Sequence, residues 1–284
     1  MKFSNVTYSH EHMVIDLSSI KENPDCNLNV YEEALDELKN LYKKGVTRII
    51  DCSNHGIGRN IECIKKIEFE TGIQILYSTG FYKDPFFPNY FESKSIAELK
   101  DIMINDIKNG ASFIGEIGTS LNQMTKNERK CFESAVLVQK ETNVPIITHT
   151  TLGTMAKQQV DFFKEQKANL SKIIISHVDL GNDINQIIDL LKQGVNVAFD
   201  TIGKLNYQSD EKRADLIIEC VKEGYVNQLF MSMDLTRKSH LRKNGGNGYA
   251  YLLENFVPLL MKKGLKEKDL EQILSSNMDL LLQR

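Results

Sequence analysis

The histidines of this chain are the residues whose type and placement most directly suggest chemistry. All six lie at the ends of short apolar segments or just after them: His10, His12, His55, His149, His177 and His240. Imidazole is the commonest nitrogen ligand for transition metals. If the apolar segments are parallel strands, their carboxyl ends meet at one rim, where α/β folds place their chemistry. The pattern therefore predicts a metal-dependent enzyme.

The first apolar segment ends in His10-Glu11-His12. Strand alternation puts both histidines on one face and Glu11 on the other, so one metal can be held by the pair while Glu11 cannot join them. Taken alone, the motif fits equally well two polar residues that face water at the end of a strand.

Single histidines close two further apolar runs. His149 follows residues 145–147 and His177 follows residues 173–175. A lone histidine in such a place is about as often a buried structural residue as a ligand. Two of them on the same rim as the first pair favour a metal site.

Two carboxylates lie at the ends of other predicted strands. Glu116 stands among glycines, and its two oxygens could bridge two metal ions; the alternative is a rim glutamate in a salt bridge. Asp234 ends the run 231–234, where a carboxylate beside a metal-bound water can act as the general base. Asp234 could also cap the segment that follows, and this role is compatible with the catalytic one.

A repeated alternation of apolar runs and amphipathic helical stretches must position these side chains. Strands alternating with helices imply parallel pairing, and eight such units fit a (β/α)8 TIM barrel that forms a single domain over residues 1–284. A Gly-rich dinucleotide turn is missing after the first strand. Residues 265–284 are expected to form a closing helix packed outside the barrel. The predicted strands are 6–12, 48–52, 75–79, 113–117, 145–149, 173–177, 195–200 and 228–234.

The composition sets limits on partners and compartment. The 284 residues include 35 basic and 38 acidic side chains, for a net charge of -3, which does not suggest a nucleic-acid partner. The chain has no apolar stretch of 18 residues and no secretion signal, so we expect no membrane partner and a cytoplasmic location. Five cysteines without a CxxC pair are expected to be reduced thiols. Apolar patches on the outer helices permit a homodimer without requiring one.

Taken together, four histidines and two carboxylates on strands one, four, five, six and eight resemble the phosphotriesterase family of the amidohydrolase superfamily, most closely its bacterial phosphotriesterase homology proteins. The resemblance covers nearly the whole chain. It is carried by the segments 114–120, 148–150, 199–204 and 232–237.

The resemblance implies a role for each residue of the set. His10, His12 and Asp234 would bind the more buried metal, and His149 and His177 the more exposed one. Glu116 would bridge the two ions, and a bridging hydroxide would be the nucleophile. The implied cofactors are two divalent ions, zinc first and manganese or cobalt as alternatives.

Two departures from the family pattern have consequences. Many members bridge the metals with a carbamylated lysine, whereas Glu116 is a permanent carboxylate, so assembly of this site should not depend on carbon dioxide. Members that hydrolyse paraoxon carry a histidine on strand seven, where this chain has Asp200-Thr201. Efficient triester hydrolysis is therefore not the expected activity.

The loop after the eighth strand suggests the charge of the substrate. Residues 236–243 carry four fixed positive charges and His240, and barrels often bind phosphate with the loops after strands seven and eight. Lys204 could join Arg237 and His240 around a dianion. For Lys238 and Lys243, a solvent-exposed basic loop is an equally good interpretation. His55 has no ligand role in the family and is expected to cap a segment or line the mouth of the cleft.

These observations predict a two-metal hydrolase that acts on an ester-like bond of a small anionic substrate. A lactone or carboxylic ester bearing phosphate is the first expectation, and a phosphoester the second. The alternatives are a metal-independent lyase or aldolase on the same barrel, and a non-catalytic metal-binding barrel.

Overall fold

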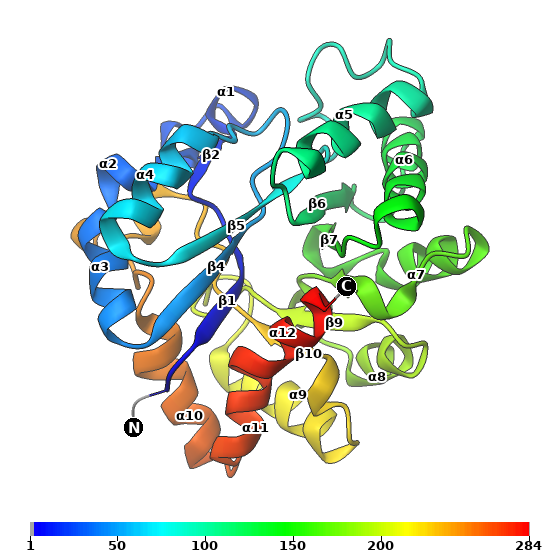
Figure 1. Ribbon diagram of the computed structural model, residues 1–284. Helices are drawn as coiled ribbons and strands as arrows, with labels where there is room; N and C mark the ends of the chain where they lie inside the picture. The colour runs from blue at the N-terminus through cyan, green and yellow to red at the C-terminus, as the bar shows by residue number, and fades with distance from the viewer. Residues whose placement is uncertain (1–2, 284) are drawn as a thin grey trace.

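The computed structural model describes residues 3–283, which form an eight-stranded parallel barrel surrounded by helices (Figure 1). The eight predicted strands are confirmed. The first and last strands lie side by side, since the Ser9 hydroxyl donates a hydrogen bond to the Met231 carbonyl (3.1 Å). In barrel order the strands are β1 Val6–Glu11, β4 Val46–Asp51, β5 Gln74–Thr79, β6 Phe113–Thr119, β7 Ile146–Thr150, β8 Ile173–Ile175, β9 Asn196–Phe199 and β10 Leu229–Met231.

Helices follow the strands and pack their apolar faces on the outside of the barrel. Side-chain caps fix where several of them begin; Ser95 and Thr125, for example, each form a capping box with a glutamate three residues later. None of the helices within residues 3–283 has the length and apolar character to cross a membrane. The principal helices are α3 Leu35–Lys43, α4 Ile61–Thr71, α5 Ile96–Lys108, α6 Lys126–Thr142, α7 Ala156–Glu165, α8 Ile184–Lys192, α9 Asp210–Lys222 and α10 Val257–Lys262.

The segment between β1 and β4 contains structure that the sequence pattern did not reveal. Two three-residue strands, β2 Val14–Asp16 and β3 Asn27–Asn29, pair antiparallel at the rim. The short helix α1 Ser18–Lys21 lies between them, and α2 Val30–Glu33 follows β3. This insertion forms part of the wall around the carboxyl ends of the strands.

The C-terminal segment is helical as expected, but it does not pack outside the barrel. It consists of α11 Glu267–Glu271, a π-helical turn Gln272–Ser276 and α12 Asn277–Leu282, and Figure 1 shows α12 beside β9 and β10. Met278 and Leu281 belong to the cluster of buried side chains inside the barrel. The Asn277 amide donates to the carbonyls of Val226 and Leu229 (2.8 and 2.7 Å), at the start of β10. The segment therefore closes the amino-terminal end of the barrel.

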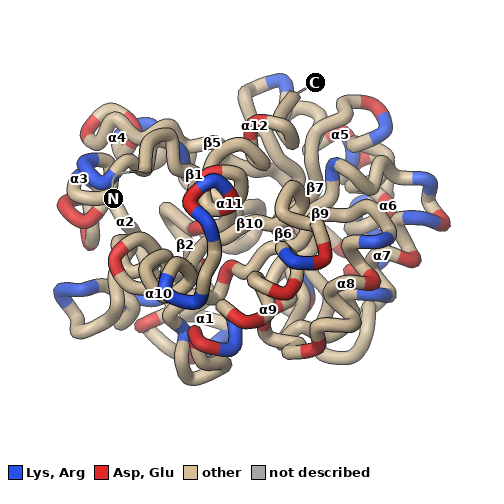
Figure 2. The backbone as a smooth tube through the Cα atoms, turned by 90° about the horizontal axis from the view of Figure 1, so that it is seen from below, with Lys and Arg blue, Asp and Glu red and all other residues tan. Residues whose placement is uncertain are grey.

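Charged residues of both signs are distributed over the outer elements. Figure 2 shows basic and acidic residues interspersed along the outer elements, as the near-balanced composition predicts. All five cysteines are buried and unpaired, in agreement with the expected reduced thiols.

Candidate metal centre

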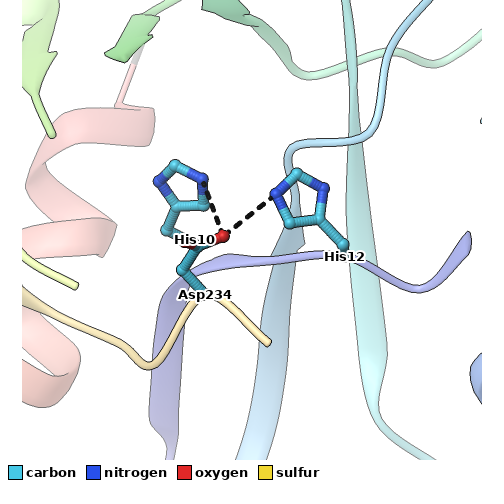
Figure 3. Close-up of side chains that lie close together, drawn as sticks. All are labelled: His10, His12 and Asp234. Atoms are coloured by element: carbon cyan, nitrogen blue, oxygen red, sulfur yellow. Dashed lines mark ion pairs between the residues drawn. The ribbon is translucent and has the colours of Figure 1, made fainter. Parts of the chain in front are cut away.

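The six predicted ligands converge at the carboxyl end of the barrel. On one side, Asp234 Oδ1 lies 3.2 Å from His12 Nε2 and 3.9 Å from His10 Nε2 (Figure 3). On the other side, His177 Nε2 lies 2.9 Å from His149 Nδ1. The ligand atoms lie within 4.8 Å of one another in three groups of potential ligands. Two consist of predicted ligands, namely His10, His12 and Asp234 in the first and Glu116, His149 and His177 in the second; the third joins His10 and His177 to Asp200.

Glu116 contacts the histidines of the first group as well as those of its own. Its Oε1 is 3.4 Å from His12 Nε2, and its Oε2 is 3.2 Å from His149 Nδ1 and 3.5 Å from His177 Nε2. Its Oε2 also lies 3.4 Å from His10 Nε2, so this carboxylate contacts all four histidines and is placed where it could bridge two metal ions.

A glycine makes room for this carboxylate. Gly115 adopts a φ of +135°, and a Cβ at this position would meet the Ile147 carbonyl oxygen at 2.1 Å. Any larger residue would push β6 away from β7 and move Glu116 with it.

Two of the candidate ligands have strained backbone conformations. His177 and Asp234 both adopt left-handed backbone conformations, with φ of 61° and 50°. Such angles are uncommon for residues with a side chain and occur where the surrounding structure enforces them, often at functional sites.

The ring nitrogens that point away from the cluster have partners of their own. His12 Nδ1 lies 3.1 Å from Ser53 Oγ, and His149 Nε2 lies 3.3 Å from Thr151 Oγ1. Outer contacts of this kind fix the orientation of a ligand ring and leave its other nitrogen free to bind a metal.

Asp200, just after β9, contacts histidines of both groups. Its Oδ1 lies 2.8 Å from His177 Nδ1 and also accepts from the His177 backbone N–H (2.9 Å). Its Oδ2 lies 2.9 Å from His10 Nδ1, close enough for an ion pair although not aligned as a hydrogen bond. Asp200 is fully buried.

Glu11 faces away from the cluster, as the strand alternation predicts. Its carboxylate accepts hydrogen bonds from the Ser232 hydroxyl (2.7 Å) and from the backbone N–H groups of Met233 (2.9 Å) and Leu235 (3.0 Å). These bonds tie β1 to the segment after β10 and so fix the position of Asp234.

The carboxylates create an environment that favours positive charge on the histidines. Burial lowers the pKa of His12, but Asp234 and Glu116 outweigh it and raise that pKa to about 9. Burial likewise opposes the charge of His177, yet Asp200 raises its pKa to about 10. Burial dominates for His149 and lowers its pKa to about 4. A divalent cation would supply the same positive charge to these carboxylates without protons on the rings.

The residues present fit a pair of such cations. The Nε2 atoms of His10 and His12 are buried without a hydrogen-bond partner, which is costly unless another group binds them. Imidazole nitrogens with carboxylate oxygens are the donor set that zinc, manganese and cobalt accept in proteins.

A cavity of about 530 Å³ lies over the cluster, and its lining includes all three predicted substrate-binding residues. The ammonium group of Lys204 contacts Asp234 Oδ2. Arg237 lines the cavity beside it. Burial lowers the pKa of His240 to about 4, and its Nδ1 accepts the Thr236 N–H (3.3 Å), so neutral His240 offers Nε2–H as a donor.

A buried arginine supports the loop that carries Lys204. Arg213 of α9 is fully buried and donates to the Asp179 carboxylate (2.7 Å), to the Thr201 hydroxyl (3.0 Å) and to the Lys204 carbonyl (3.2 Å). The helical pattern of α9 alone did not reveal this inward-facing guanidinium.

The remaining basic residues of the loop after β10 face elsewhere. Lys238 and Lys243 pair with Glu33, and Arg242 pairs with Glu254. Of the four fixed positive charges expected to mark the substrate, only Arg237 therefore lines the cavity.

His55 is also absent from the cavity lining, contrary to one of its two expected roles. Its Nε2 lies 2.7 Å from Asp106 Oδ2, and Asp106 also accepts from Arg59 (2.8 Å) and Thr79 (2.6 Å). This polar cluster joins α5 to the ends of β4 and β5.

Sequence reasoning did not single out several cavity residues. The Tyr82 hydroxyl lies 3.3 Å from the ring nitrogens of His149, and Lys21 and Lys83 line the same space. Tyr82 and Lys83 follow the third barrel strand closely, and this position near the carboxyl end of a strand is the sequence signal that could have identified them as cavity residues.

Comparison with known proteins gives concordant results. The sequence model of the phosphotriesterase family matches residues 4–282. The phosphotriesterase homology protein of Escherichia coli is 38% identical over 278 residues, covering 95% of each chain. The N-acetyltaurine hydrolase of Mus musculus is 31% identical over 297 residues, covering 96% of this chain and 85% of the mouse protein.

Solved structures agree with the sequence matches. The E. coli protein, crystallised with phosphate in its active site, superposes with a TM-score of 0.96 at 37% identity over the whole of both chains. A lactonase from Listeria monocytogenes superposes with a TM-score of 0.92 at 26% identity, over 98% of this chain and 94% of the lactonase.

The barrel, its converging ligands and these relatives define a metal-dependent hydrolase. The chain belongs to the phosphotriesterase family.

Proposed function

We propose that the chain hydrolyses an ester-like bond of a small anionic substrate with the help of two divalent cations, zinc in the first instance. His10, His12 and Asp234 hold one ion, His149 and His177 hold the other, and Glu116 contacts both. The observation that carries the proposal is the position of Glu116, whose carboxylate lies within 3.5 Å of a ring nitrogen of each of the four histidines. When bound, such cations polarise the scissile bond and lower the pKa of a water molecule at the centre.

The chain supplies the proton acceptor. Burial raises the pKa of Asp234, but the charge of Lys204 and the contact with His12 outweigh it and hold that pKa well below its usual range. An ionised carboxylate at the edge of the cavity can take the proton of the attacking water. Lys204 contacts the oxygen of Asp234 that faces away from His12, and so keeps the carboxylate in place.

The substrate's anionic group binds beside this acceptor. Arg237 offers paired N–H donors and neutral His240 offers one more, with Lys204 close by. A lactone or carboxylic ester bearing phosphate is the favoured substrate, and a phosphoester is the second choice. The lactonase among the structural relatives and the phosphate in the E. coli relative support this order.

A second candidate is the hydrolysis of an amide. The mouse relative is named for N-acetyltaurine, an acetamide whose other end is an anionic sulfonate. The same cations and the same cationic side chains would serve an amide of this kind. The family relationship favours either hydrolysis over a lyase or aldolase reaction.

A substrate screen with protein of measured metal content tests the proposal. Sugar lactones with and without phosphate, simple phosphoesters and N-acetyltaurine would be compared on zinc-loaded protein. We expect a phosphorylated lactone to give the highest kcat/KM and Arg237→Met to raise its KM. Protein that binds less than one metal per chain after supplementation, or that turns over none of these compounds, would contradict the proposal.

A further inference from the structure

Positive charge lies on two walls of the main cavity. Lys204 and Arg237 follow β9 and β10, whereas Lys83 follows β5. β5 and β9 are the third and seventh strands in barrel order, four places apart in a ring of eight, so their loops face each other across the barrel. Lys21, at the end of α1, adds a second ammonium group to the lining.

Packing against a barrel strand fixes the position of Lys83. A Cβ at Gly118 would meet Cδ of Lys83 at 3.1 Å and Cβ of Lys83 and of His149 at 3.2 Å. The stem of Lys83 therefore lies over the bare backbone of β6, next to a metal ligand. Its ammonium group stands over the rings of Tyr82 (5.6 Å) and Phe86 (5.7 Å).

Lys83 has no direct carboxylate partner in the described chain, and Glu128, Glu116 and Asp84 act on its charge from farther away. Among residues 3–283, no carboxylate lies within 4.0 Å of its ammonium group, and its hydrogen bond goes to the Asp84 carbonyl (3.2 Å). Lys21 also lacks a carboxylate partner in the described chain, and its ammonium group stands over the same Phe86 ring at 5.9 Å. Lys204, by contrast, pairs with Asp234. Two unpaired cations around one ring form a place where an anion is strongly favoured.

We propose that Lys83, across the metal centre from Lys204 and Arg237, binds a second anionic group of the substrate and that Lys21 assists it. This inference rests on the proposed function, because it takes the hydrolysed bond to lie at the metal centre and the first anionic group beside Arg237. The substrate then carries one acidic group on each side of the scissile bond. The ring of Phe86 between the two lysines leaves an apolar surface for the carbon chain that joins this second group to the reacting bond.

Dicarboxylates of increasing length test the inference on the zinc-loaded protein. Succinate, glutarate and adipate would be compared by calorimetry with butyrate, pentanoate and hexanoate, which have the same carbon chains and one acid group. We expect at least one diacid to bind about tenfold more tightly than its monoacid, the value of one charged hydrogen bond. Lys83→Met should remove most of this preference, whereas Lys83→Arg should keep it.

Control measurements show whether a loss of diacid binding is specific to the removal of Lys83. Lys65→Met removes an exposed lysine of α4 that does not line the cavity and should bind the diacids as the unchanged protein does. Zinc content and circular dichroism of Lys83→Met should match those of the unchanged protein. A wild-type protein without diacid preference, or a preference that survives Lys83→Met and disappears in Lys204→Met, would overturn the inference.

Binding of inorganic phosphate distinguishes failure of the Lys83 inference from failure of the proposed function. The proposed function expects Arg237→Met to weaken phosphate binding, whereas the inference expects Lys83→Met to remove the diacid preference. If phosphate binding is unaffected by Arg237→Met while Lys83→Met still removes the preference, the first anion site is wrong and the Lys83 site is supported. The reverse result refutes the Lys83 site alone.

Discussion

Asp200 accepts two hydrogen bonds from His177, one from its backbone N–H at 2.9 Å and one from its ring Nδ1 at 2.8 Å. The other oxygen of Asp200 faces His10, which belongs to the other group of ligands. A single buried carboxylate therefore contacts one histidine in each half of the candidate metal centre.

Removing this charge should weaken both metal sites together. We expect Asp200→Asn to lower zinc affinity at both sites by about 10- to 100-fold, the usual effect of losing an outer carboxylate partner. Competition with a chromophoric chelator, with zinc content measured after dialysis, provides the readout. Ser53→Ala is the matched control, since His12 is the one candidate ligand that Ser53 contacts, so the change should affect one site. Two sites of unchanged affinity in Asp200→Asn would show that Asp200 does not orient the ligands.

Because Glu116 is a permanent carboxylate, we expect the candidate metal centre to assemble without carbon dioxide. Removing the metals with a chelator should abolish hydrolysis, and two equivalents of zinc should restore it equally well with and without bicarbonate. The reason is that Glu116 carries its negative charge without a carbamylation step. Recovery would be followed as zinc content and rate in carbon dioxide-depleted buffer. Recovery that requires bicarbonate would mean that a modified side chain takes part.

Neutralising Asp234 should affect the reaction more than the fold. We expect Asp234→Asn, at conditions that keep both metals bound, to lower kcat by about 10²- to 10⁴-fold because the proton acceptor is lost. Asp16→Asn makes the same chemical change at an exposed carboxylate of β2 and should leave kcat unchanged. Turnover that survives in the fully metallated Asp234 variant would reject its assigned role.

The cluster around Asp106 predicts a pH-dependent contribution to stability. Burial raises the pKa of Asp106, but hydrogen bonds from His55, Arg59 and Thr79 outweigh it and hold that pKa well below its ordinary value. A carboxyl whose pKa is lower in the folded state stabilises the fold above its unfolded pKa of about 4, and this contribution is lost as pH falls toward the folded value.

Asp106→Asn should therefore be less stable than the unchanged protein by about 1 to 3 kcal/mol at pH 7, and the difference should shrink below about pH 4. Urea unfolding at a series of pH values measures it. Asp101→Asn, at an exposed site on the same helix, should show no such difference. A difference that stays constant from pH 7 to pH 3 would contradict the argument.

The convergence of most candidate ligands could be predicted because it depends on strand ends and alternation. His10 and His12 share a face of β1, and Glu116, His149 and Asp234 each close or follow an apolar run, so the barrel order alone brings them together. The role of Asp200 could not be predicted in this way. Its contacts with two histidines depend on how far β9 extends along β8 toward the carboxyl end of the barrel, and no local sequence pattern encodes this register.

Other features depend on contacts that a sequence does not display. Lys83 and Lys238 are both lysines in rim loops, but one lies over the bare backbone at Gly118 and the other pairs with Glu33. The antiparallel strands β2 and β3 have three residues each, too few for a recognisable alternation. The amphipathic pattern of the C-terminal helix is the same whether its apolar face covers a barrel wall or a barrel end.

The closure of the barrel by α12 has a consequence for synthesis of the protein. Ile174 and Phe230, deep in the barrel, share their cluster with Met278 and Leu281. During translation these apolar interior surfaces stay open to water until the segment 277–282 has left the ribosome. Nascent chains stalled before that point would expose apolar, aggregation-prone interior surfaces and recruit chaperones.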